Sequence, residues 1–313
     1  MSAAVAVAYF AGIALIYRFI DPSTLEMALR LPWSLVLALL GLSLVNYAVR
    51  GWRWLVLSRH MGVQVPLGSN LLYYFSAYAF TTTPGKAGEA VRLWFLKSGH
   101  GIAYTRSLPL MLADRIIDAW AVLLLSMISI AGFSAYRWHG LAAAAVVALV
   151  SAPVLFPRRI EPLLGAVYGW LPRRGRLLVR VRRLLHAMAD LSSWRTYGLT
   201  LVPTIAGWLA EAAGLYLLLR YFGTEVGFVS AVFVFSFAMI VGAISMMPGG
   251  LGSTEATMVI LLNVLGVDLG TALAVTAIVR IATFWFAVLI GVLLMPPALG
   301  AATRAGRLLL RAA

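Results

Sequence analysis

Apolar runs of about 20 residues recur along the chain, and they constrain its fold more than any other feature. An α-helix rises 1.5 Å per residue, so such a run crosses the ~30 Å hydrocarbon core of a bilayer. The chain is 62% hydrophobic and only 12% charged, about half the charge of a soluble domain. We therefore predict an all-α polytopic membrane protein.

Six runs are long enough for full spans: 3–20, 33–57, 107–134, 140–157, 196–220 and 270–296. Two further apolar stretches, 68–98 and 228–265, are interrupted by PGKAG and PGGLG. The limbs after these breaks have only about 11 and 13 residues and reach ~17–20 Å, which is too short to cross the membrane. We therefore predict two re-entrant helical hairpins, each of which enters and leaves on the same side.

The basic residues predict the topology. With six spans and two hairpins, one side receives Arg50, Arg53, Arg59, Lys97, Arg106, Arg158, Arg159, Arg173, Arg174, Arg176, Arg180, Arg182, Arg183, Arg195, Arg304, Arg307 and Arg311. The other side receives only Arg18, Arg30, Arg137 and Arg220. The positive-inside rule then predicts that both termini are cytoplasmic, in a bacterial inner membrane.

This topology also accounts for the formal charge of +14 without a nucleic-acid partner. The basic segment 158–195 has helical character and could lie on anionic lipid headgroups. An ordinary cytoplasmic loop is an equally good interpretation of it.

The two breaks resemble each other. PGKAGEA begins at Pro84 and PGGLGSTEA at Pro248, so that Glu89 matches Glu255 after a two-residue insertion. Arg115 follows the first Glu at nearly the spacing at which Arg280 follows the second. Since the spans before the two hairpins run in opposite directions, we predict inverted repeats over 33–134 and 196–296. This layout is typical of secondary transporters with a site between the halves.

Each break is expected to start a new short helix, near Ala87 or Ser253. Pro and Gly end the preceding helix and allow unusual backbone angles. The free N–H groups and positive dipole end of a helix start suit an anion such as phosphate. We therefore expect an anion site between the breaks.

Our candidate substrate-binding residues are Lys86, Gly88, Glu89, Arg92, Asp114, Arg115, Asp118, Glu211, Gly249, Gly252, Glu255 and Arg280. Each ionisable member would cost ~2.5–3.5 kcal/mol at a lipid-facing helix centre. We therefore expect the ionisable members to face an interior cavity and to pair with one another.

Purely structural roles stay open for single members. Glu89 could pair with Arg92 within one turn, and Glu255 could cap its helix. Arg115 could serve only to neutralise a neighbouring Asp, and Lys86 could extend to the interface. Glu211 stands alone in its span, within AGWLAEAAG. It is our candidate for a proton-linked carboxylate, although the small residues around it equally favour close helix packing.

Other chemistry is poorly supported. The chain has no Cys, its four His residues lack a metal-ligand spacing, and no GxxxxGK[ST] motif occurs. We therefore expect no metal, no cofactor and no enzymatic activity. The exception is that Asp114 and Asp118 could hold a divalent cation in a membrane-embedded transferase.

The motifs PGKAGEAVR, ADRIIDAW, PGGLGSTEA and IVRIATFW, in this order over about 40–295, resemble the lysylphosphatidylglycerol synthase transmembrane, or flippase-like, family. The resemblance assigns to the family's polar core Gly88, Glu89, Arg92, Asp114, Arg115, Asp118, Pro248, Gly249, Gly252, Glu255 and Arg280. It implies movement of lipids across the bilayer. The soluble aminoacyl-transfer domain of fused members is not seen in this sequence, so the resemblance does not extend to synthase activity.

We therefore expect a lipid flippase that works by alternating access. Its substrate would be a phosphate-bearing phospholipid, a hopanoid-type lipid or a polyprenyl-linked lipid, and a homodimer is compatible with this function. The alternatives are a lipid-modifying transferase and a non-catalytic membrane partner subunit.

Overall fold

A computed structural model describes residues 21–83, 87–129 and 194–312, together with Val7, Ala11 and Ala145. All regular secondary structure in these ranges is helical. The predicted spans 3–20 and 140–157 lie outside the described residues, as do Pro84 to Lys86 and nearly all of the basic segment 158–195.

The described helices are α2 (Pro22–Leu29), α3 (Trp33–His60), α4 (Leu67–Ser76), η2 (Ala77–Phe80), η3 (Ala87–Ala90), α5 (Val91–His100), α6 (Tyr104–Ser129), α10 (Trp194–Tyr221), α11 (Phe228–Ile244), α12 (Ser253–Val264), α13 (Leu269–Arg280), the π-helical η7 (Ile281–Trp285) and α14 (Phe286–Ala312). Three described stretches are long and apolar enough to cross a membrane: Trp33–His60, Arg195–Tyr221 and Leu269–Leu308. The protein is therefore a multi-pass helical membrane protein, as predicted.

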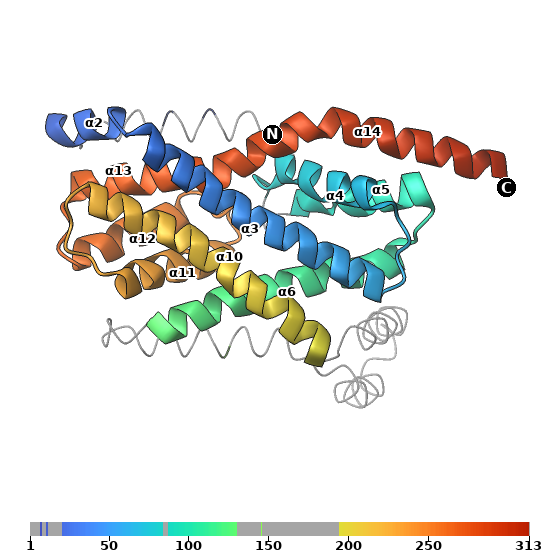
Figure 1. Cartoon of the computed structure of the whole chain (residues 1–313), viewed down its shortest axis with the longest axis horizontal. Helices are drawn as coiled ribbons and strands as arrows, with labels where there is room; N and C mark the ends of the chain where they lie inside the picture. The colour runs from blue at the N-terminus through green and yellow to red at the C-terminus, as the bar shows by residue number, and fades with distance from the viewer. Residues whose placement is uncertain are drawn as a thin grey trace, which may run out of the picture.

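Both apolar stretches with a Pro-Gly motif are broken helix pairs. The first pair is α4 with η2, followed by η3 with α5, and the first break lies between Phe80 and Ala87, of which residues 81–83 are described. The second pair is α11 and α12, and residues 245–252 form the second break. Figure 1 shows the α4–α5 pair toward the end of the molecule that carries the C-terminus and the α11–α12 pair toward the opposite end.

Two apolar clusters hold these pairs in place. One joins α10, α11, α12 and α13 through side chains such as Leu215, Phe233 and Leu262. The other joins α3, α4, α5 and α14 through side chains such as Trp54, Tyr73 and Phe95. Burial of apolar surface stabilises each pair against the long helices beside it, and the polar residues of both breaks lie between the two clusters.

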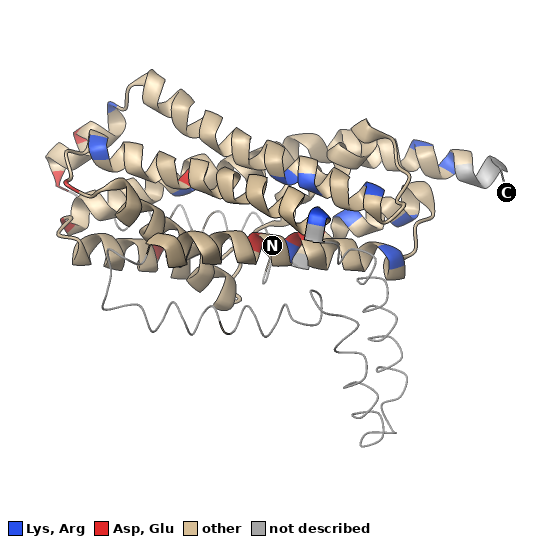
Figure 2. Ribbon diagram, turned by 60° about the horizontal axis from the view of Figure 1, so that its bottom comes forward, with Lys and Arg blue, Asp and Glu red and all other residues tan. Residues whose placement is uncertain are grey.

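Charged residues are sparse and unevenly placed. Figure 2 shows red and blue segments together near the middle of the molecule. Outside this centre, most blue segments lie toward the end with the C-terminus, whereas red segments lie at the opposite end.

The structure corrects two expectations from the sequence. Arg50 and Arg53 were expected in a loop after the second span, but α3 continues to His60 and buries both side chains. Burial of the two guanidinium groups is tolerated because Asp114 and Asp118 pair with them. The last span, predicted over 270–296, is a nearly continuous helix from Leu269 to Ala312 that also holds Arg304 and Arg307.

The long C-terminal helix packs very closely on the first broken pair at Gly291. A Cβ atom built there would lie 2.1 Å from the Ala79 amide nitrogen, whereas a Cβ at Gly300 meets nothing within 4 Å. Gly291 therefore sets the distance between α14 and η2.

We predict that Gly291→Ala destabilises the protein, because α14 must move away from the η2 backbone. The expected loss is about 1–3 kcal/mol in the free energy of unfolding, as for other overpacked sites. Unfolding of the detergent-solubilised protein by denaturant measures it. Gly300→Ala is the matched control, and equal stability of the two variants would contradict this packing.

Candidate functional site

Arg53 is at the centre of the buried polar region. Its side chain is 0% exposed and contacts Asp114 at 2.5 Å and Asp118 at 2.8 Å. Asp114 and Asp118 are four residues apart on α6 and therefore share one face of that helix. One guanidinium group thus holds two carboxylates, which joins α3 to α6.

A second arginine on the same face of α3 extends this contact. Arg50 lies three residues before Arg53, so the two side chains are neighbours on α3. Arg50 contacts Asp118 at 2.9 Å. Trp208 of α10 donates its indole N–H to Asp118 at 3.2 Å, and Arg53 donates to the Thr204 hydroxyl at 3.1 Å. The network therefore fixes α10 as well.

The segment after the first break supplies Glu89 and Arg92, and α6 supplies Arg115. Arg92 contacts Glu89 at 2.8 Å and Asp114 at 3.2 Å, and its guanidinium lies 4.7 Å from the centre of the Trp54 ring. Arg115 contacts Glu89 at 3.2 Å and Asp114 at 2.9 Å. The pairings considered from the sequence for Glu89 and Arg115 are thus present in the structure.

These seven residues form a single central ion network: Arg50, Arg53, Glu89, Arg92, Asp114, Arg115 and Asp118. Four guanidinium groups face three carboxylates, so the network as described carries one net positive charge when all are ionised. Buried charges are tolerated only when they are paired and hydrogen-bonded. Arg115 is its most accessible cation, with a side chain that is 26% exposed.

A separate pair forms at the second break. Arg280 donates to the Glu255 carboxylate at 2.6 Å and lies 4.5 Å from the centre of the Phe284 ring. The same carboxylate accepts the Gly252 N–H at 2.7 Å, which satisfies one of the amides at the start of α12. The expectation of a helix start with free N–H groups is therefore wrong at Gly252, and the capping role considered for Glu255 is confirmed.

The two breaks touch each other at Gly249. This residue has φ of +63°, and a Cβ atom there would lie 2.5 Å from the Phe284 ring and 3.2 Å from the Thr81 carbonyl oxygen. Only glycine fits both the backbone angle and the space. At the first break Gly88 is equally confined, since its Cβ would meet Phe80 and Thr83 at 2.7 Å.

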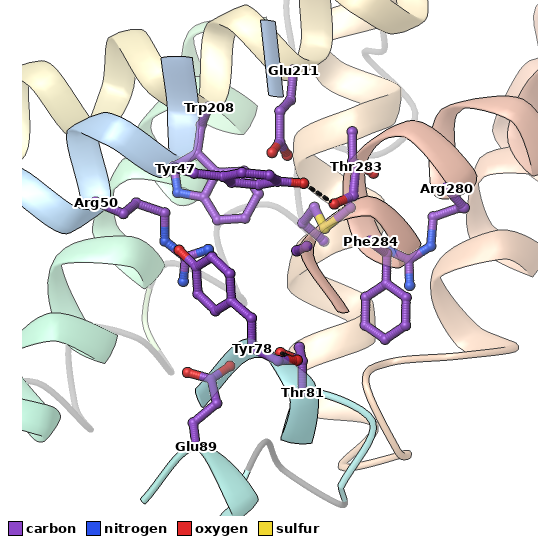
Figure 3. A pocket seen from close by; sticks show the side chains of 12 residues that line it. Tyr47, Arg50, Tyr78, Thr81, Glu89, Trp208, Glu211, Arg280, Thr283 and Phe284 are labelled. Carbon is purple, nitrogen blue, oxygen red and sulfur yellow. Dashed lines mark hydrogen bonds between the residues drawn. The ribbon is translucent and has the colours of Figure 1, made fainter. Parts of the chain in front are cut away.

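Two cavities lie beside this contact. The inner cavity, of about 50 Å³, is lined by Tyr47, Arg50, Tyr78, Thr81, Glu89, Trp208, Glu211, Met239, Arg280, Thr283, Phe284 and Ala287 (Figure 3). The outer cavity, of about 220 Å³, is lined by Arg115, Asp118, Ala119, Val122, Trp208, Met239, Gly242, Ala243, Met246, Met247, Gly249, Gly250, Thr254, Arg280 and Phe284. Trp208, Met239, Arg280 and Phe284 line both cavities. The inner cavity has room for water, whereas the outer one approaches the size of a small-ligand pocket.

The structure brings the predicted residues together in two groups. Glu89, Arg92, Asp114, Arg115 and Asp118 belong to the central network, and Glu255 with Arg280 forms the second pair. Gly88, Gly249 and Gly252 shape the breaks, and Glu211 points into the inner cavity from α10 (Figure 3). Lys86 lies outside the described residues.

Sequence reasoning missed four side chains at this site: Tyr47, Arg50, Arg53 and Trp208. A usable signal existed for the two arginines. In VRGWRW they are three residues apart and flanked by apolar residues, a pattern typical of one helix face that meets acidic partners.

The fold and the site define a class of protein: a polytopic α-helical membrane protein with a buried ionic centre between two broken helix pairs. The sequence profile of the family described as lysylphosphatidylglycerol synthase TM region matches residues 1–291. This chain belongs to that family.

Three relatives are each named as a UPF0104 membrane protein. Two come from Methanothermobacter thermautotrophicus: one is 26% identical and covers 91% of this chain and 92% of its own, and the other is 24% identical and covers 83% and 82%. The third, from Pyrococcus horikoshii, is 26% identical and covers 68% of this chain and 71% of its own. The similarity to these membrane proteins thus extends over most of the chain.

We predict that Arg53→Met strongly destabilises the protein, because it leaves two buried carboxylates with a missing partner. Breaking one partner of a buried pair costs about 3–5 kcal/mol. The free energy of unfolding in detergent measures this effect.

Arg30→Met is the matched control. Arg30 pairs with Glu26 in α2, but both side chains are largely exposed, and exposed pairs contribute ~0–1 kcal/mol. Equal losses for the two variants would contradict the role assigned to the central ion network.

Proposed function

We propose that this protein is a lipid flippase that moves an anionic, phosphate-bearing lipid headgroup across the membrane by alternating access. The observation that carries the proposal is the contact between the two breaks, with a cation-lined cavity beside it. Ionisable residues inside a membrane segment are costly, and they mark transport pathways by default. Membership of a family named for a lipid-synthase membrane region is consistent with a lipid substrate.

The topology belongs to this proposal. We propose six full spans, with the α4–α5 and α11–α12 pairs as re-entrant hairpins in inverted repeats. The two pairs lie toward opposite ends of the molecule (Figure 1), as inverted repeats require. The basic end with the C-terminus (Figure 2) is the cytoplasmic one under the positive-inside rule. Both termini would then be in the cytoplasm of a bacterial inner membrane.

The headgroup would enter the outer cavity. Arg115 is partly exposed there and belongs to a network with excess positive charge, so it can accept a phosphate without leaving a carboxylate unpaired. Arg92 is 1% exposed and enclosed by Glu89, Asp114 and Trp54, so it would position its neighbours and not contact the lipid. The acyl chains would lie along Met246 and Met247, which line the same cavity and are exposed.

Alternation would come from the contact at Gly249. Arg280 and Phe284 are among the side chains that line both cavities, and the pair Glu255–Arg280 spans α12 and α13. Movement of the second broken pair against the first would open the path past these side chains from one membrane face and close it from the other.

The transferase alternative is weakened by the geometry. Asp114 and Asp118 would have to hold a divalent cation, but four guanidinium groups already contact them. A second positive ion there would meet strong repulsion. We therefore propose that the protein is not an enzyme and works without a metal or cofactor.

Translocation of labelled lipids in proteoliposomes tests the proposal. We expect the purified chain to move anionic phospholipids or polyprenyl-linked phosphates faster than empty vesicles do. A charge-assisted hydrogen bond contributes about 1.5–3 kcal/mol, so we expect Arg115→Gln to slow translocation by about 10- to 100-fold.

Arg106→Gln is the matched control and should translocate at the wild-type rate. Arg106 is exposed on the same helix and donates only to the Met61 and Gly62 carbonyl groups. Wild-type rates equal to those of empty vesicles, across a panel of phosphate-bearing lipids, would overturn the proposal and leave a role as a partner subunit.

A further inference from the structure

A short π-helical segment, Ile281–Trp285, joins α13 to α14 directly after Arg280. The Tyr47 hydroxyl of α3 donates to the Thr283 carbonyl of this segment. In a regular α-helix that carbonyl would accept the Ala287 amide. The tyrosine hydroxyl thus bonds to a carbonyl of the helix ladder, and insertion of a side chain into that ladder is a recognised cause of helix irregularity.

This segment connects a helix that packs on the second broken pair to a helix that packs on the first. Before it, α13 packs on α10 and on α12 of the second pair. After it, α14 packs on α4, η2 and α5 of the first pair. A π-helical turn has more residues per turn than an α-helical one, so a change between the two rotates α13 relative to α14.

Glu211 lies on the other side of the same hydroxyl. Its side chain is buried, and its carboxylate points toward the Tyr47 hydroxyl in the inner cavity (Figure 3). The remaining charged or titratable groups that line this cavity are Arg50 on α3, Tyr78 on η2, Glu89 on η3 and Arg280 on α13, whereas α11 contributes only Met239. Asp118 of α6 is not among the residues that line this cavity, and it accepts the indole N–H of Trp208.

Two groups therefore compete for one hydroxyl proton. A tyrosine O–H donates a single hydrogen bond, and both the Thr283 carbonyl and an ionised Glu211 carboxylate are acceptors. Bonds to an ionised acceptor are about twice as strong as bonds between neutral groups. A protonated Glu211 is the weaker acceptor, and it carries an O–H of its own.

We propose that Glu211 is a proton-binding site that controls the π-helical segment through Tyr47. When Glu211 is protonated, the Tyr47 hydroxyl donates to the Thr283 carbonyl and holds the π-helical turn. When Glu211 loses its proton to water, the hydroxyl turns to the carboxylate. The Ala287 amide then bonds to the Thr283 carbonyl, and the helix becomes regular.

This switch would move two side chains that line both cavities. Arg280 ends α13, and Phe284 lies within the π-helical segment. Rotation of α13 against α14 displaces both, and with them the pair Glu255–Arg280. The inference rests on the proposed function in one respect, because alternating access requires that the two cavities open in turn. The proton on Glu211 is then the ligand that sets which cavity is open.

The experiment measures the helix itself and needs no lipid substrate. The chain has no cysteine, so Leu269→Cys and Leu308→Cys, both exposed, place one spin label on α13 and one near the end of α14. Electron–electron double resonance in nanodiscs then gives their separation as a function of pH. We expect two distance populations whose proportions change with pH.

Glu211→Gln should fix one population at every pH, and Tyr47→Phe should abolish the pH dependence. Glu225→Gln and Tyr197→Phe are the matched controls, since Glu225 is exposed and the Tyr197 hydroxyl has no hydrogen-bond partner among the described residues. Glu211→Asp keeps a carboxylate and should shift the midpoint pH without removing the transition. A pH dependence that persists in Glu211→Gln, or a wild-type distance that does not change with pH, would overturn the inference.

This outcome is separable from the test of lipid translocation. A pH-dependent distance with no translocation would sink the flippase proposal and leave the proton switch standing. Translocation with a pH-independent distance would sink the switch and leave the flippase.

Discussion

The contact of Arg53 with Asp114 and Asp118 is the interaction on which the rest of the site depends. It lies where three helices cross, and its guanidinium is fully enclosed. In a medium of low dielectric constant, an isolated charge at this position would be prohibitive, whereas a bidentate pair is tolerated. The other members of the central ion network are arranged around this pair, so α3, α6 and the segment after the first break cannot move independently of one another.

The second break is built differently. Its Glu255–Arg280 pair corresponds to Glu89–Arg115 in the repeat predicted from the sequence, but it stands apart from the central ion network. Among the described residues, its further partners are the Gly252 amide, the Gly249 carbonyl and the Phe284 ring. Under the proposed alternating access, this asymmetry would make the first pair the fixed part of the molecule and the second pair the part that moves, which agrees with the π-helical segment next to Arg280.

Much of this arrangement could be predicted from the sequence, because broken helices and spacing leave visible patterns. The Pro-Gly motifs indicated both breaks, and the pairs of Glu89 with Arg92 and of Arg115 with a neighbouring Asp, considered from the sequence, are present in the structure. Arg50 and Arg53 could not be placed in the same way. A topology argument treats an arginine near the end of an apolar run as a loop residue. The spacing in VRGWRW indicates that the two arginines share one helix face, but their acidic partners on α6 are distant in sequence.

Other features leave no local signal at all. The π-helical turn depends on Tyr47, which is more than two hundred residues away in sequence, and no propensity within Ile281–Trp285 marks it. The contact between the breaks depends on the absence of a side chain at Gly249 and on Phe284 folding back over it. Such features follow from tertiary packing, which single-sequence patterns do not encode.

The proposed function requires that the space beside the two breaks binds a phosphate-bearing headgroup. An electron cryo-microscopy structure of the protein in nanodiscs of anionic lipid tests this requirement. We expect density for a headgroup in the outer cavity, with its phosphate within hydrogen-bonding distance of Arg115 and its chains along Met246 and Met247. Ordered lipid on the outer helix surfaces together with a cavity that holds only water would contradict it.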